Sequence, residues 1–64
     1  MKIYQVISYE ADKETIKKVD FAETSAEAIA KAVSYHKDGV RAEAVEIVMD
    51  YETLAVKSKL VIYD

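Results

Sequence analysis

The side chains best suited to chemistry are one histidine and a few neighbouring hydroxyl and carboxyl groups. His36 is the only histidine, and Ser34 precedes it by two residues. Residues two apart on a helix point in different directions, so this pair is not a nucleophile with its base. A metal ion on His36 and Asp38 would lack further ligands of the expected kind. We therefore interpret His36 as a half-exposed residue near a helix C-terminus, where the helix dipole favours an imidazolium.

The other patterns that carry catalysis are missing from the sequence. Asp50 and Glu52 would share one face of a strand, but nothing indicates a pocket around them, which favours a solvated face over an acid–base pair. A single glycine, Gly39, is too few for a phosphate-binding loop. We expect no catalytic residue, no metal ion and no cofactor, and we do not expect an enzyme.

Tyrosine is the one residue type in excess. The chain has five tyrosines, namely Tyr4, Tyr9, Tyr35, Tyr51 and Tyr63. A small sheet uses tyrosine as bulk with a hydrated hydroxyl, and protein interfaces use it at their energetic centres. Base stacking would be a third role, with phosphate contacts from the lysines of the first hairpin or the last strand (Lys13, Lys17, Lys18, Lys57 and Lys59). The formal charge of −3 and the pI of about 5.0 disfavour nucleic acid as a partner.

Length and composition predict one small domain over residues 1–64. A chain of this size buries only ~60% of its unfolded surface and usually needs a further source of stability. The absence of cysteine excludes disulfides and thiolate zinc sites, so we expect a homo-oligomer, in the simplest case a dimer. No apolar run approaches the ~20 residues of a membrane span. We expect no membrane contact and a cytoplasmic location.

The first half of the chain predicts a β-hairpin that leads into a helix. Residues 2–9 are rich in Ile, Val and Tyr, and residues 15–22 alternate between apolar and charged side chains. The polar segment 11–14 between them suits a hairpin loop. Thr24 and Glu27 fit a capping box, in which the hydroxyl accepts from the Glu27 amide and the carboxylate reaches back to the Thr24 amide.

The helix that follows is rich in alanine, a strong helix former. An apolar stripe at helical spacing predicts the buried face, and it consists of Ala26, Ile29, Ala30 and Val33. Glu27 and Lys31 are placed for an ion pair on the polar face. Gly39 fits the position just past the helix end, where the backbone adopts positive φ.

The second half predicts two more strands. In residues 45–52, apolar side chains alternate with a second set that is acidic except for Val48, although a helix over 42–55 also matches part of the pattern. The alternation and the β-branched content favour the strand. A turn at Glu52 and Thr53 would precede a last strand over about 54–63. The predicted fold is α+β, a four-stranded antiparallel sheet with one helix on one face, in the order ββαββ.

One helix can cover only one face of such a sheet. The uncovered face would then carry apolar side chains, and exposed apolar patches mark interaction surfaces. We assign this interface to some of five residues, which are Tyr4, Val6, Val48, Val61 and Tyr63.

A resemblance adds to this interpretation. The segment 21–29, with the sequence FAETSAEAI, resembles the strand-to-helix entry of many small phage or prophage accessory proteins. A similar entry occurs in the arm-binding domains of tyrosine recombinases, whose sheets are more basic. The phage resemblance implies a small non-catalytic protein that binds and modulates a host or phage protein. We therefore expect a non-enzymatic accessory protein that acts as a homodimer. The alternatives are a small nucleic-acid-binding module and a small-ligand-binding module.

Overall fold

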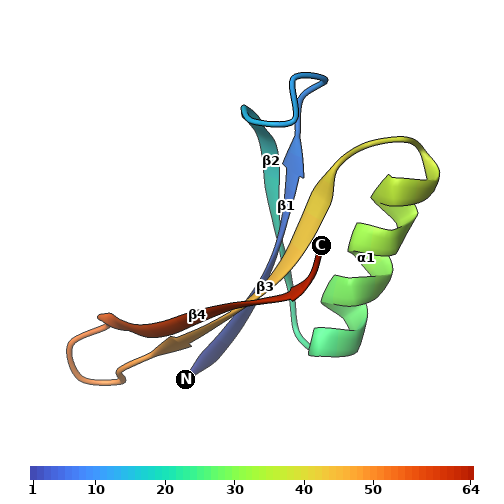
Figure 1. Cartoon of the computed structure of the whole chain (residues 1–64). Helices are drawn as coiled ribbons and strands as arrows, with labels where there is room; N and C mark the ends of the chain where they lie inside the picture. The colour runs from blue at the N-terminus through green and yellow to red at the C-terminus, as the bar shows by residue number, and fades with distance from the viewer.

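The computed structural model describes residues 1–64 as four strands and one helix. The elements are β1 (Lys2–Tyr9), β2 (Ile16–Ala22), α1 (Ser25–Lys37), β3 (Ala42–Met49) and β4 (Val56–Tyr63). The strands form one antiparallel sheet and α1 packs on one of its faces (Figure 1). The predicted α+β class and the ββαββ order are confirmed, and residues 42–49 are a strand and not part of a helix. The second and fourth strands begin one and two residues later than the sequence pattern indicated, and the third strand spans 42–49 instead of 45–52.

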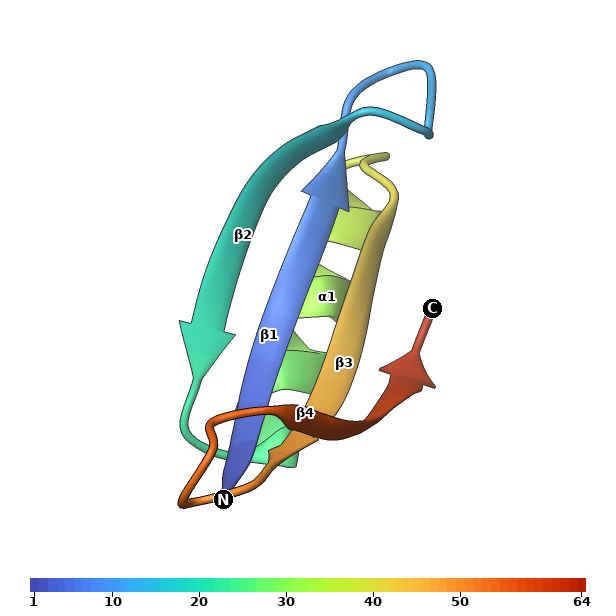
Figure 2. The same ribbon diagram turned by 90° about the vertical axis from the view of Figure 1, so that its left-hand side faces the viewer.

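The strand order across the sheet is β2-β1-β3-β4, so the first and third strands are central. Tyr4 lies opposite Ala22 on β2 and opposite Glu46 on β3. Figure 2 looks onto the face without the helix, where β2, β1 and β3 run side by side in front of α1. Irregular register on β4 accompanies a sharp bend, and the β3–β4 hairpin projects away from α1 (Figure 1).

The core lies between α1 and the central strands. It is built mainly from small side chains, which are Val6, Ala28, Ala32, Ala42 and Ala44, all with an exposed fraction of 0%. Alanine on both the helix and β3 lets the two backbones approach closely, because neither element carries a long side chain at the contact. Larger side chains such as Tyr4, Tyr35 and Ile62 close the margins of this core.

The predicted helix stripe is therefore partly wrong. Ala26 and Ala30 are exposed, whereas Ala28 and Ala32 face the sheet and Ile29 packs at their side. The stripe had been centred on the largest apolar residues. The sheet already supplies bulk at this point through Val6, so the helix presents its smallest residues.

The helix begins as the sequence indicated, with one difference in the cap. The Thr24 hydroxyl accepts from the Glu27 amide at 3.1 Å, which confirms Thr24 as the N-cap. The Glu27 carboxylate accepts from the Glu23 amide at 3.2 Å instead of from the Thr24 amide. Glu27 also pairs with Lys31 at 3.6 Å, as predicted.

The helix ends in a Schellman motif centred on Gly39. The Val40 amide donates to the Tyr35 carbonyl and the Gly39 amide donates to the His36 carbonyl, both at 3.0 Å. Gly39 has a φ of 76°, in the left-handed region that glycine adopts without strain. A side chain at this position would meet no atom within 4 Å. The requirement for glycine is therefore one of backbone conformation alone.

Replacing Gly39 by valine should lower the free energy of unfolding by about 1–2 kcal/mol, because a β-branched residue resists positive φ. Gly39→Asn is the matched control and should lose less, since asparagine tolerates the left-handed region. Urea unfolding followed by circular dichroism measures both. Equal losses for the two variants would mean that conformation is not what selects glycine here.

A larger side chain at Ala32 should separate the helix from the sheet. We expect Ala32→Leu to destabilise the fold by about 1–3 kcal/mol through overpacking. Ala30→Leu, on the exposed side of the same helix, should change the unfolding midpoint little. If Ala32→Leu unfolds at the same urea concentration as Ala30→Leu, the close contact between α1 and β3 is not a feature of the fold.

Candidate functional site

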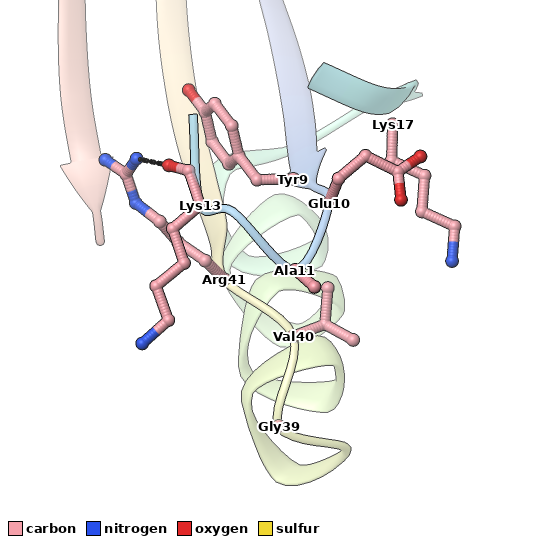
Figure 3. Close-up of a pocket in the computed structure, with 8 residues that line it drawn as sticks. All are labelled: Tyr9, Glu10, Ala11, Lys13, Lys17, Gly39, Val40 and Arg41. Atoms are coloured by element: carbon pink, nitrogen blue, oxygen red, sulfur yellow. Dashed lines mark hydrogen bonds between the residues drawn. The ribbon is translucent and has the colours of Figure 1, made fainter. Parts of the chain in front are cut away.

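A cleft of about 280 Å³ lies beside the β1–β2 loop and is the larger of two in the structure. Lys13, Lys17 and Arg41 bring positive charge to its lining, and Glu10 brings a carboxylate. Figure 3 shows that the amino groups of the two lysines point to opposite sides. The Arg41 guanidinium is already engaged, since it donates to the Lys13 carbonyl and lies 4.4 Å from the centre of the Tyr9 ring. The cations therefore do not converge on one ligand.

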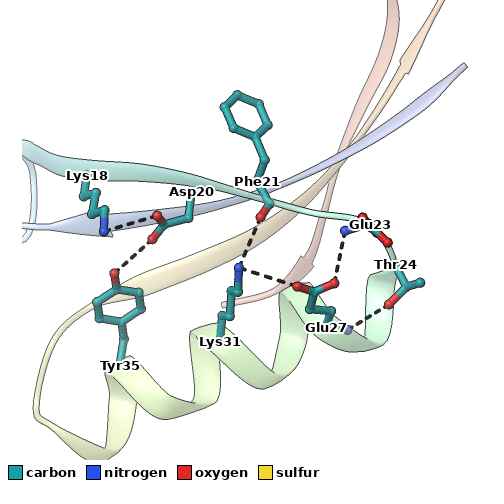
Figure 4. A network of polar contacts seen from close by, with 8 residues as sticks. All are labelled: Lys18, Asp20, Phe21, Glu23, Thr24, Glu27, Lys31 and Tyr35. Carbon is teal, nitrogen blue, oxygen red and sulfur yellow. Dashed lines mark hydrogen bonds and ion pairs between the residues drawn. The ribbon is translucent and has the colours of Figure 1, made fainter.

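The second cleft, of about 260 Å³, lies between α1 and β2 and is crossed by polar contacts. The Tyr35 hydroxyl donates to Asp20 at 3.1 Å, and Asp20 also pairs with Lys18 at 3.3 Å. Lys31 donates to the Phe21 carbonyl at 3.2 Å (Figure 4). These contacts attach the helix to the edge strand, and they already use the polar groups that a ligand would need.

His36 links the end of the helix to the sheet. Its Nε2 donates to the Ala42 carbonyl at 2.9 Å, and its ring centre lies 5.2 Å from that of Tyr63. Ser34 makes no hydrogen bond with it. No group of three or more His, Cys, Asp or Glu side chains is placed to hold a metal ion. The contacts of His36 are those of a structural residue.

The two hairpin loops share the pattern Asp-x-Glu-Thr and the same use of the aspartate. Asp12 accepts from the amides of Glu14 and Thr15 and from the Thr15 hydroxyl. These bonds, the hydroxyl first, lower the pKa of Asp12 to about 2. Asp50 accepts from the amides of Glu52 and Thr53 in the same way. The pKa of Asp50 is also lowered, mainly by the hydrogen bond from the Thr53 amide. Asp50 is thus a loop-forming residue and not half of an acid–base pair.

The largest feature without an evident structural role is the face of the sheet opposite α1. We call it the open face and define it by strand register as Ile3, Gln5, Ile7, Val19, Phe21, Val45, Ile47 and Val61. Phe21 on β2, Gln5 on β1, Val45 on β3 and Val61 on β4 form one row across all four strands. Figure 4 shows the Phe21 ring projecting from β2 on the side away from the helix. Gln5 is the polar residue of this central row, and Glu43 and Lys59, opposite Ile7 and Ile47, lie on the same side of the sheet nearer its ends.

Exposure divides the open face into a covered centre and an exposed margin. Ile7 and Val45 are only 7% and 1% exposed, although α1 lies on the opposite face of the sheet (Figure 2). The apolar side chains on the two edge strands are left open to solvent. Phe21 is 62% exposed, and Val61 and Val19 are 46% and 41% exposed. A contiguous apolar surface of this kind is typical of a contact site.

Charged groups lie at the margins of the open face. At one end, the Tyr9 hydroxyl donates to Glu43, which raises the pKa of Tyr9, and burial raises it further. Lys59, opposite Ile47 on the edge strand β4, takes part in no ion pair. An apolar centre with a polar rim is the usual composition of a protein interface.

The prediction of which residues lie on the uncovered face was largely wrong. Val6 is fully buried under α1, and Tyr4 and Tyr63 pack against the same core. Val48 follows the register of the covered face. Of the predicted interface residues, only Val61 lies on the open face. Both faces of β1 are apolar. Alternation along the strand therefore separates its residues into two faces, but it does not indicate which face the helix covers. The small residues Ala42 and Ala44 were the signal that could have settled it.

No protein family model, curated protein or solved structure matches this chain. Its one helix is too short and too polar to cross a membrane. The proposals below therefore depend on the geometry of the chain itself.

The lowered pKa of Asp12 predicts how loop stability depends on pH. The carboxylate is ionised above the ordinary pKa of 3.8, where its stabilising effect is complete, and this effect is lost as the pH falls through about 2. The variant Asp12→Asn keeps an oxygen acceptor but does not titrate. We expect the difference in thermal midpoint between wild type and variant to shrink over this acid range. A difference that stays constant would show that the ionised form is not what holds the loop.

Proposed function

We propose that this chain is a non-catalytic protein-binding module whose contact surface is the open face. The observation that carries this proposal is the exposed apolar margin around Phe21, Val19 and Val61 on the face that α1 leaves uncovered. An exposed phenylalanine lowers solubility and adds little to the stability of the isolated domain. Aromatic side chains at a contact surface contribute strongly to binding when a partner removes them from water.

The shape and charge of the surface favour a protein over the alternatives. A small ligand is usually bound in a concave site with a few convergent polar groups, whereas the central row of the open face is apolar apart from Gln5. Nucleic acid requires cations that converge on phosphates. Lys18 and Lys57 are instead paired with Asp20 and Asp50, and the unpaired Lys59 is a single cation at the margin of the open face.

A module of this kind acts by occupying a surface of its partner, without chemical change in either protein. This mode of action agrees with the resemblance of segment 21–29 to small phage accessory proteins. The absence of cysteine is compatible with a reducing compartment, and we propose the cytoplasm.

Photo-crosslinking tests the proposed surface. The photoreactive residue p-benzoylphenylalanine would replace Phe21 in one variant and Tyr51 in the other. Both native residues are exposed aromatics, but Tyr51 lies in the β3–β4 loop and is 77% exposed. After irradiation in cells of the source organism, we expect discrete protein adducts from position 21 and not from position 51.

The identity of the crosslinked protein does not matter for this test, because either a second copy or another protein would support a contact surface. Circular dichroism of both purified variants checks that the fold is retained. Absence of any adduct at position 21, or the same adducts at both positions, would contradict the proposed surface.

A further inference from the structure

We infer that the partner on the open face is a second copy of this chain, with the two open faces packed against each other. This inference rests on the proposed function, since it names the occupant of the same surface. Three properties of the face support it: its area, the distribution of large and small residues across it, and the position of its unpaired charges.

The area of the face reaches the minimum for a specific interface between two copies. Strands of 7 and 8 residues in a four-stranded sheet give a footprint of roughly 500 Å² per copy, from the rise per residue and the spacing between strands. Two copies would bury about 1,000 Å², which reaches the lower range of specific interfaces. The β3–β4 hairpin also projects away from α1 (Figure 1), so it can add contacts along the edge of a facing copy.

The residues across the face indicate how two copies would be oriented. The central row has its largest apolar side chain, Phe21, on the edge strand β2 and a smaller one, Val61, on the opposite edge strand β4. A two-fold axis parallel to the strands places β2 of each copy over β4 of the other. Phe21 then faces Val61, Gln5 faces Val45 and Ile3 faces Ile47, so the largest side chain of the face meets a small one. An axis across the strands would place Phe21 against Phe21 and leave the other edge loosely packed.

The unpaired charges agree with the same orientation. Lys59 lies on β4 at the level of Ile3 and Ile47. Glu23 directly follows β2 at that level, next to Ala22, which pairs with Tyr4. Neither Lys59 nor Glu23 forms an ion pair within its own chain. With β2 over β4, the cation of one copy lies beside the carboxylate of the other, twice in each dimer. Opposite charges at the rim help to set the orientation of a complex.

Sedimentation of the purified protein tests the inference. We expect a dimer for the wild type and for Tyr51→Ser, and a monomer for Phe21→Ser at the same concentration. We also expect the thermal midpoint of the wild type to rise with protein concentration, because mass action stabilises a dimer. A wild-type monomer, or a midpoint that is constant over a roughly hundredfold concentration range, would overturn the inference.

The orientation has its own test, which uses the absence of native cysteine. Phe21→Cys protein is mixed with Val61→Cys protein and treated with a short bismaleimide. We expect crosslinked pairs that contain one chain of each kind. Leu60→Cys is the control, because Leu60 is 59% exposed on the same strand but faces the other side of the sheet. Crosslinking as efficient with Leu60→Cys, or only between identical variants, would overturn the orientation.

These outcomes separate the inference from the proposed function. A monomeric protein whose position 21 crosslinks to a different protein would overturn self-association and leave the protein-binding role intact. A monomer without any adduct at that position would overturn both.

Discussion

The close contact between α1 and the middle of the sheet determines the rest of this structure. Ala28 and Ala32 lie directly on Val6, Ala42 and Ala44, with no long side chain between the layers. Small residues allow a tight contact, and they also make it a small one. The hydrophobic stabilisation from this layer is modest because each buried alanine removes little apolar area from water. A chain of 64 residues with such a core has little stability in reserve.

The open face is the other consequence of having a single helix. Ile7 and Val45 are buried there by their own neighbours, so the sheet has a second, partial core that lacks an outer layer. An antiparallel sheet that ends in water normally carries polar residues on that side. Here the solvent side carries apolar residues on all four strands, and its charged residues, Glu43 and Lys59, lie nearer the two ends. The residue pattern of the sheet therefore suits a fold with a layer on each face, and this chain supplies a layer on one face only.

The sequence predicts the order of the elements and both ends of the helix well, because these depend on local interactions, whereas the predicted third strand lies three residues too late. The Thr24 cap and the Gly39 conformation involve residues a few positions apart, and the alternation in β3 reflects the pleat of a single strand. The covered face of the sheet and the buried side of the helix were harder to predict. Both depend on the contact between the small residues of β3 and those of α1. A hydrophobic pattern that ranks residues by size favours Ile29 and Val33 for the buried side of the helix, in place of Ala28 and Ala32. The sequence also does not predict the cleft lined by Lys13, Lys17 and Arg41, because this cleft forms only where the loop after α1 meets the β1–β2 loop.

The pairing of β1 with β3 has a consequence for the kinetics of folding. The two hairpins join residues close in sequence, whereas Lys2 lies opposite Val48 and the Met49 amide donates to the Met1 carbonyl. The chain must close a loop that contains β2 and the whole of α1 before these bonds form, and the entropy of that closure is lost before the contacts compensate for it. Docking of the two hairpins, with the helix as their connection, is accordingly the step that sets the folding rate. Until it occurs, the inner edges of β1 and β3 are unpaired, and the chain is then most open to association with other unfolded copies.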